Sequence, residues 1–326
     1  MLKKTALAHH ASGLCTPVFL TYAHRVSMST KHLLLHFKRL KFAFAVLATL
    51  LTVSAWADEI VEIKHSVVFE DRSVSIQGHL RRNASNNAER SPAVVLIHSA
   101  GGWTDGTTAP LAKLLNEAGF HTFELRFFPT NKQLAEQHLQ VQRTYAALDY
   151  LANLPDVDPA RIGIAGFSMG AHLSIWTTSE ILTAKFGKGQ QFAAHVPVYP
   201  VCWLQSQLIR GIMGNAGIRF GLPADFMSRF TGKPVKILAA GLDDYDGRDP
   251  KACENFVAQI PEDSRKSFEV HTYLEATHGW NQRTRSFFEP IACKGRGCTN
   301  HNVFNPSVTE RSNLKIVKFF VDTLKQ

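Results

Sequence analysis

Short apolar runs alternate with segments of helical spacing along most of this chain, and this alternation most limits the folds it can adopt. The clearest runs are Ala93–Ile97, Arg161–Ala165, Phe192–Val198 and Pro234–Ala240. Short continuous apolar strands are typical of parallel sheets that are buried on both faces. The segments between them show helical spacing, as in Lys132–Asn153. We therefore predict an α/β fold, with a mostly parallel central sheet and helices on both faces.

Further elements complete this pattern. Glu59–Glu70 and Arg72–Leu80 are expected to form a hairpin at the sheet edge, and Phe120–Phe127 and Phe268–Leu274 are expected to be strands. The other helices expected are Pro110–Ala118, Ala171–Leu182, one that starts near Pro250, and Val308–Leu324. Residues 202–230 break the alternation and are rich in Gly, so they form either a cap over a site or an ordinary loop with one helix. We predict that residues 58–326 form one domain.

The N-terminal segment has the composition of an export leader. Lys38, Arg39 and Lys41 precede an apolar run over residues 42–53, and Ala55-Trp56-Ala57 follows. A basic region, a short apolar region and an A-x-A site are typical of a cleaved signal peptide. The run is short for a membrane helix, which needs about 20 apolar residues, although an uncleaved anchor is the alternative. We predict a leader over residues 1–57, with Met28 as the alternative start, and a periplasmic or secreted product.

The charge of the chain belongs mostly to this leader. Residues 1–57 carry seven of the 36 Lys and Arg residues and none of the 27 Asp and Glu residues. The remaining chain is therefore close to neutral and lacks the basic surface that nucleic-acid binding requires. We expect neither a nucleic-acid partner nor stable membrane insertion once the leader is removed.

Four cysteines remain after the leader, namely Cys202, Cys253, Cys293 and Cys298. An even number in an exported chain indicates disulfides, with three possible pairings. Cys293 and Cys298 flank a Gly-containing loop, which favours a short bridge there and leaves Cys202 for Cys253. Cys293, Cys298 and His301 could instead belong to a metal site, but a closed zinc site needs four ligands. We predict disulfides and no metal.

A nucleophile motif lies between a predicted strand and a predicted helix. Gly166-Phe167-Ser168-Met169-Gly170 has the form G-x-S-x-G, which places a serine on a sharp strand-to-helix turn. The alternative is a structural serine in a tight turn. A serine hydroxyl attacks only when a base takes its proton. The position of His278, in a Gly-containing loop after the strand Phe268–Leu274, favours it as this base.

The third member of such a triad is an acid that orients the histidine. Asp243, Asp244 and Asp246 all follow the strand Pro234–Ala240. We favour Asp244, with Asp246 next and Asp243 third. The chain order of serine, aspartate and histidine is that of the hydrolase fold.

Two further sets of residues are expected around the nucleophile. Backbone N–H groups must stabilise the charge that develops on a tetrahedral intermediate, and we assign these to Met169 and Ala100. The alternative for residues 98–102 is a simple Gly-rich turn. Trp103 and Arg126 are candidates for the substrate pocket by position, although aromatic residues there more often belong to the core.

The chain resembles the dienelactone hydrolase branch of the α/β-hydrolases. The resemblance covers most of residues 90–285 and is carried by His98-Ser99-Ala100-Gly101-Gly102-Trp103, Gly166-Phe167-Ser168-Met169-Gly170, Tyr199-Pro200-Val201-Cys202, Gly241-Leu242-Asp243-Asp244-Tyr245 and Ala276-Thr277-His278-Gly279. It implies hydrolysis of a small-molecule carboxylic ester or lactone through an acyl-enzyme, without a cofactor. The founding members use a cysteine nucleophile, whereas this chain carries Ser168, and export argues against dienelactone itself as the substrate.

Two alternatives remain at this point. An acyltransferase or a peptidase would use the same triad, and exclusion of water from the pocket would favour transfer. A non-catalytic periplasmic binding protein would keep the fold without turnover, because a fold alone does not establish activity.

Overall fold

A computed structural model describes residues 58–66, 73–83, 90–129, 139–212 and 222–326. The predicted leader over residues 1–57 lies outside the described residues and stays a prediction. The same holds for residues 213–221 of the predicted cap and for the start of the helix predicted at Lys132.

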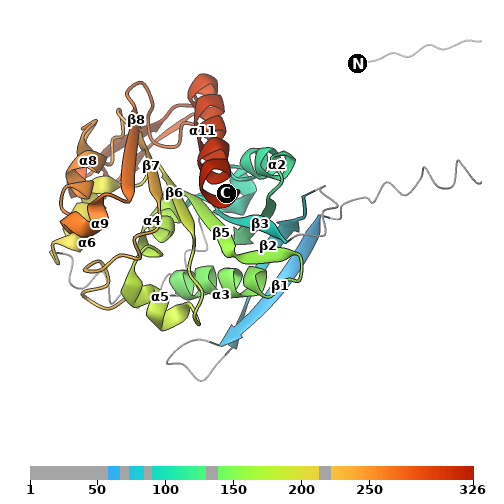
Figure 1. Cartoon of the computed structure of the whole chain (residues 1–326). Coiled ribbons are helices and arrows are strands. Elements are labelled where there is room, and N and C mark those ends of the chain that lie inside the picture. The colour runs from blue at the N-terminus through green and yellow to red at the C-terminus, as the bar shows by residue number, and fades with distance from the viewer. Residues whose placement is uncertain (1–57, 67–72, 84–89, 130–138, 213–221) are drawn as a thin grey trace, which may run out of the picture. The chain divides into compact units, whose positions relative to one another are not determined.

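An eight-stranded sheet forms the centre of the described part (Figure 1). Its spatial order is β1-β2-β4-β3-β5-β6-β7-β8. The two opening strands form the predicted antiparallel hairpin, β2 also pairs antiparallel with β4, and all later pairs are parallel. In chain order the strands are β1 (Glu59–Ser66), β2 (Ser73–Arg81), β3 (Ser91–Ile97), β4 (His121–Arg126), β5 (Val157–Phe167), β6 (Ala194–Val198), β7 (Val235–Ala240) and β8 (Phe268–Tyr273).

Helices cover both faces of this sheet, which confirms the predicted fold class. The apolar side chains of α2 (Ala109–Glu117) and α11 (Pro306–Leu324) pack in one buried cluster. A second cluster takes in the helices of the opposite face, namely α3 (Gln140–Ala152), α4 (Met169–Trp176), α5 (Glu180–Phe186), α6 (Cys202–Ile209) and α8 (Ala252–Val257). A short helix, α9 (Glu262–Arg265), precedes β8, and a 3-10 turn, η1 (Trp103–Asp105), follows β3.

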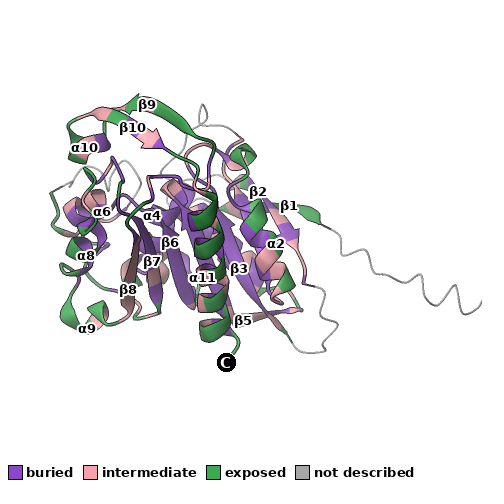
Figure 2. Cartoon of the chain, turned by 90° about the horizontal axis from the view of Figure 1, so that it is seen from above, coloured by how far each residue is buried: buried purple, intermediate pink, exposed green. Residues whose placement is uncertain are grey.

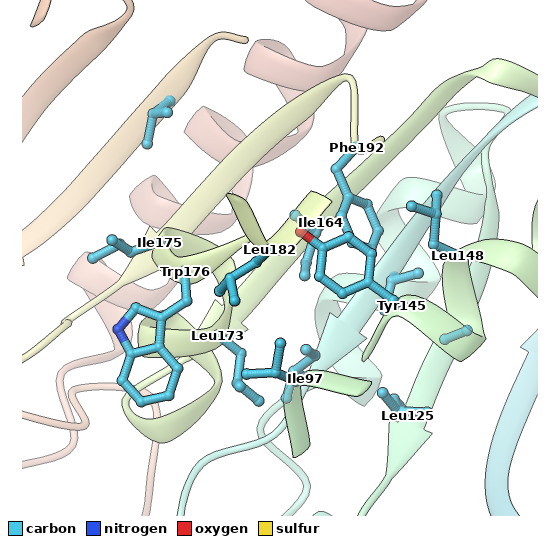
Figure 3. Close-up of a cluster of buried hydrophobic side chains, with 14 of the residues drawn as sticks. Ile97, Leu125, Tyr145, Leu148, Ile164, Leu173, Ile175, Trp176, Leu182 and Phe192 are labelled. Carbon is cyan, nitrogen blue, oxygen red and sulfur yellow. The ribbon is translucent and has the colours of Figure 1, made fainter. Parts of the chain in front are cut away.

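Strand β3 shows why its sequence is continuously apolar. Val94 and Leu96 belong to the cluster with α2 and α11, whereas Ala93, Val95 and Ile97 belong to the opposite one. Successive side chains of a strand point to opposite faces, so a strand covered on both sides must be apolar at every position. Figure 3 shows the larger cluster, in which side chains of α3, α4 and α5 converge on the sheet.

Two regions differ from the sequence-based expectation. The helix predicted over Ala171–Leu182 is two helices, because the chain leaves α4 after Trp176 and Ser179 begins α5 by accepting the Leu182 N–H at 3.2 Å. A second, two-stranded sheet was not predicted. It consists of β9 (Arg285–Glu289) and β10 (Cys298–Asn302), joined through α10 (Ala292–Gly295).

The β9–β10 hairpin lies beyond one end of the central strands (Figure 2). Its strands read RSFFE and CTNHN and keep most of their side chains at least partly exposed. They therefore lack the apolar run or the regular alternation that marks a core strand. The hairpin matters for the site, because the residues that follow β7 bind to it.

The two disulfides have the predicted pairing. Cys202 at the start of α6 is bonded to Cys253 in α8, and Cys293 is bonded to Cys298 across the turn of the β9–β10 hairpin. Neither pair of sulfurs is available as thiolate ligands, so the alternative of a metal site on Cys293, Cys298 and His301 has lost two of its three ligands.

The segment predicted as a cap divides into different parts. Helix α6 occupies its start, and its end packs into the large core cluster through Leu222, Phe226, Met227 and Phe230. In the described part of residues 202–230, only the beginning therefore lies near the nucleophile. Among the helices that the structure describes, none is both long enough and apolar enough to span a bilayer.

Candidate active site

Ser168 lies on the predicted turn between β5 and α4. Its backbone has φ 53° and ψ −107°, a conformation that non-glycine residues rarely adopt and that costs roughly 1–3 kcal/mol. The flanking glycines allow this turn. A Cβ on Gly166 would lie 2.0 Å from the Gly170 carbonyl oxygen, and one on Gly170 would lie 2.5 Å from the Ile97 carbonyl oxygen. The motif is therefore needed for close backbone approach, and it lifts the serine side chain out of the strand.

His278 reaches Ser168 from the loop after β8. The Ser168 Oγ and His278 Nε2 atoms lie 2.8 Å apart, a hydrogen-bond distance. His278 is 3% exposed, and two aromatic rings enclose its imidazole. The centroid of the imidazole ring lies 5.0 Å from that of Tyr199 and 4.5 Å from that of Tyr245. The parallel strands β5 and β8 end at the same edge of the sheet, which is why these residues meet across 110 positions of sequence.

Asp243 is the acid that contacts His278. Its Oδ2 lies 2.7 Å from His278 Nδ1, and its Oδ1 accepts the Tyr245 N–H at 2.9 Å. An ionised carboxylate only accepts hydrogen bonds, so this contact requires a proton on Nδ1 and leaves Nε2 free to accept from the Ser168 hydroxyl. The preference for Asp244 is therefore wrong in this geometry, and the third-ranked residue takes the position.

Asp244 makes its contacts with Arg248 and His301 instead. Its Oδ1 accepts from Arg248 Nε at 2.7 Å, and its Oδ2 accepts the His301 N–H at 2.8 Å. Burial raises the pKa of Asp244, but the hydrogen bonds from Arg248 and His301 outweigh burial and the net shift is downward. Asp244 thus binds the turn after β7 to the β9–β10 hairpin.

The Asp246 side chain caps the start of helix α6 from outside the helix. Its two oxygens accept the N–H groups of Cys202 at 3.1 Å and Trp203 at 2.7 Å, which are donors that a helix start leaves unpaired. Burial and the nearby Asp243 raise the pKa of Asp246, although these two N–H groups oppose the shift. Asp246 also lies beside the Cys202–Cys253 bridge, where the oxidised sulfurs offer no thiolate to a metal.

The predicted oxyanion donors follow the ends of two neighbouring parallel strands, β5 and β3. Met169 is the first residue of α4, whose first N–H groups have no partner within the helix. Ala100 lies in the turn after β3, and its N–H donates no hydrogen bond within the residues that the structure describes. This turn is braced by Ser99, whose Oγ donates to Asp105 Oδ2 at 2.7 Å and accepts the Gly101 N–H at 3.1 Å.

A small, mostly apolar hollow of about 170 Å³ opens beside Ser168. Its described lining comes from the start of α3, from the elbow and α4, from the start of α6, from the turn after β7 and from the hairpin. It consists of Gln140, Ser168, Met169, His172, Leu173, Trp176, Val201, Leu204, Tyr245 and Ile291. Trp103 and Arg126, the predicted pocket residues, are not among them. The Arg126 guanidinium lies 4.4 Å from the Trp103 ring centroid, and both line a separate hollow with Glu124. The role of these two residues in a substrate pocket therefore stays a prediction, and the described lining of the hollow at the nucleophile does not include them.

A row of hydrogen-bonded side chains beside this hollow, Trp176, Gln205 and His172, was not predicted from the sequence. We call it the polar chain. Trp176 Nε1 donates to Gln205 Oε1 at 3.0 Å, and Gln205 Nε2 lies 2.6 Å from His172 Nδ1. Burial lowers the pKa of His172 to about 3, and the proximity of His278 contributes further. The spacing of His172 from Ser168 was the available signal, since residues four apart share one side of a helix. Nothing in the sequence connects Gln205 to either residue.

The chain matches the dienelactone hydrolase family over residues 80–324. None of the curated proteins is similar enough in sequence to count as a match.

Solved esterases share the fold at low sequence identity. Est1E from Butyrivibrio proteoclasticus is 16% identical with a TM-score of 0.56, and the match covers 83% of this chain and 100% of that one. The propionate-bound thermophilic esterase Est2 from Thermogutta terrifontis is 16% identical with a TM-score of 0.57, covering 81% and 93%. The butyrate-bound form of the same esterase gives the same values. These likenesses confirm the predicted α/β-hydrolase fold.

Proposed function

The chain belongs to the dienelactone hydrolase family, and from this premise we propose that it hydrolyses a small carboxylic ester or lactone with Ser168 as nucleophile. The observation that carries the proposal is the continuous contact from Ser168 Oγ to His278 Nε2 at 2.8 Å and from His278 Nδ1 to Asp243 Oδ2 at 2.7 Å. Such an arrangement activates a serine hydroxyl that is otherwise a weak nucleophile.

The proposed reaction has two halves. In the first, Ser168 Oγ attacks the carbonyl carbon while His278 Nε2 takes the hydroxyl proton, and Asp243 stabilises the imidazolium that results. The N–H groups of Met169 and Ala100 hold the oxyanion. The tetrahedral intermediate collapses to an acyl-serine, and His278 passes its proton to the leaving alkoxide. In the second half, water attacks the acyl carbon with His278 as base, which releases the acid and restores Ser168.

The size of the hollow supports a short substrate group. Its volume of about 170 Å³ is below the ~300–1,000 Å³ that is typical of pockets for larger ligands. Apolar side chains, among them Leu173, Val201 and Leu204, form much of its described lining. The esterase of T. terrifontis was solved with propionate and with butyrate, both of which are short acyl groups. We propose short-chain esters on these grounds.

Export is part of the proposal. Two disulfides are typical of proteins in oxidising compartments. Together with the leader-like composition of residues 1–57, they support a periplasmic or secreted hydrolase in which residues 58–326 are the mature domain.

A fluorophosphonate probe tests the nucleophile. The intact mass of the protein after treatment is expected to rise by one adduct, because Ser168 Oγ displaces fluoride from phosphorus. A Ser168→Ala variant with an unchanged circular dichroism spectrum is expected to stay unlabelled. Folded wild type without an adduct would overturn the serine mechanism and favour a binding protein on this fold.

A further inference from the structure

The hollow beside Ser168 contains one histidine that the proposed reaction does not use. His172 lies four residues after the nucleophile, on α4. Its backbone N–H donates to the Ser168 carbonyl oxygen at 3.2 Å. Its residue is 9% exposed, and it lines the hollow among mostly apolar neighbours. A polar ring in such a wall calls for an account of where its two nitrogens bond.

Two consecutive hydrogen bonds determine which nitrogen of His172 carries the proton. An indole Nε1–H can only donate, so the Trp176 bond at 3.0 Å requires the oxygen of the Gln205 amide on that side. The amide nitrogen of Gln205 is then directed at His172 Nδ1, 2.6 Å away. An amide NH₂ group is a donor, so Nδ1 of His172 must accept. In a neutral imidazole the proton then resides on Nε2.

This second nitrogen is available to a ligand. Among the described residues, His172 Nε2 has no hydrogen-bond partner, and His172 belongs to the lining of the hollow beside Ser168. Gln205 is fully buried and Trp176 is 4% exposed, so the polar chain behind His172 is shielded from competing water. Burial keeps the pKa of His172 near 3, so the ring stays neutral at ordinary pH and presents one N–H donor.

We propose that His172 determines specificity by donating its Nε2–H to an acceptor oxygen on the substrate group that enters this hollow. The substrate class is then a short ester whose bound group carries an ether, carbonyl or hydroxyl oxygen besides the ester itself. The inference rests on the proposed hydrolase function. The physical reason for discrimination is that a purely aliphatic group would bury the N–H without a partner, which is unfavourable.

Matched esters test the preference. 4-Nitrophenyl methoxyacetate and 4-nitrophenyl butanoate differ by one oxygen in place of a methylene in the acyl group, and 2-methoxyethyl acetate and butyl acetate differ in the same way in the alcohol. For each pair the ratio of kcat/KM, oxygen-containing over aliphatic, is measured in wild type and variants. Intrinsic reactivity cancels when the ratio in a variant is divided by the ratio in wild type.

His172→Leu removes the donor, and His172→Gln keeps an amide donor of similar reach. In His172→Leu, the kcat/KM ratio is expected to fall about three- to tenfold for the ester pair whose varied group binds in the hollow. This is the effect expected from the loss of one hydrogen bond between neutral groups. It is expected to be largely retained in His172→Gln. Leu204→Met, a volume-conserving change in the same hollow, is expected to affect both esters of a pair equally. Unchanged ratios for both pairs in His172→Leu would overturn the proposal.

The tautomer is measured separately from activity. Nitrogen-15 NMR of histidine-labelled protein is expected to show His172 neutral and protonated at Nε2 between pH 5 and 8. A Gln205→Leu variant removes the partner of Nδ1 and is expected to give a mixture of tautomers. Protonation of His172 at Nδ1 in wild type would overturn the proposal even if the enzyme is active. If wild type hydrolyses no ester and takes no fluorophosphonate, the proposed function fails, and the Nε2–H result alone still identifies the donor.

Discussion

The two turns that form the site, the nucleophile elbow at Ser168 and the acid turn at residues 243–246, are built in different ways. The elbow is a local structure, because its strand, its glycines and its helix are consecutive in the chain. The acid turn carries three aspartates whose roles depend on distant partners. Asp243 bonds to His278, Asp244 to Arg248 and His301, and Asp246 to the start of α6.

The elbow depends on consecutive residues, whereas the acid turn depends on contacts from a distant part of the chain. The glycine positions of the elbow can be read from five residues, since a side chain at Gly166 or Gly170 would collide with backbone. The acid turn is held from outside, because Asp244 and Tyr245 accept the N–H groups of Cys293 and Lys294 through their carbonyl oxygens at 2.7 and 3.0 Å. Its geometry is set by a hairpin 50 residues further along the chain.

The largest effect is expected from exchanging the roles of the adjacent acids. Asp243→Asn removes the carboxylate that keeps the proton on His278 Nδ1, and kcat for 4-nitrophenyl acetate is expected to fall about 10³- to 10⁴-fold. Asp244→Asn changes contacts to Arg248 and His301 only, and its loss is expected to stay within about tenfold, the scale of one or two hydrogen bonds. Equal losses in the two variants would show that the acid turn acts as one unit and would break the distinction drawn between them.

The two disulfides, one next to the acid turn and one at the start of α6, are expected to contribute different amounts to the free energy of unfolding. The Cys202–Cys253 bridge has a sequence separation of 51 and the Cys293–Cys298 bridge a separation of 5. Loop-closure entropy then predicts that the double alanine variants lose about 4 and about 2 kcal/mol of unfolding free energy, respectively. Urea unfolding under non-reducing conditions measures both. A larger loss for Cys293→Ala/Cys298→Ala would mean that the hairpin stabilises the fold through contacts rather than through loop closure.

The smallest effect is expected from the elbow itself. Gly170→Ala places a methyl group 2.5 Å from the Ile97 carbonyl oxygen and 2.9 Å from that of His98. This overpacking is expected to lower the free energy of unfolding by about 1–3 kcal/mol. The rate of fluorophosphonate labelling should fall with it, because α4 must move away from β3. Gly189→Ala is the control, since a Cβ there meets nothing within 4 Å and only its φ of +84° is strained. A labelling rate in Gly170→Ala that equals the control would contradict the local account of the elbow.

Much of the fold and part of the candidate site were predictable from sequence. The doubly covered sheet follows from apolar runs such as Ala93–Ile97, and the structure brings Ser168 and His278 together as expected. The choice of acid was not predictable, because Asp243, Asp244 and Asp246 follow the same strand and differ only in side-chain direction. The surroundings of the predicted pocket residues were not predictable for a related reason. Arg126 ends β4 and Trp103 follows the neighbouring strand β3, yet the two side chains contact each other and line a separate hollow.

Features that depend on neighbours along the chain, such as the strand periodicity and the G-x-S-x-G turn, follow from sequence because steric exclusion and hydrophobic spacing act over a few residues. Contacts between distant segments set the partners of each aspartate, the hairpin beside the site and the tautomer of His172. Hydrogen bonds act over about 3 Å and specify a direction, so they are defined only after residues far apart in sequence have been brought together.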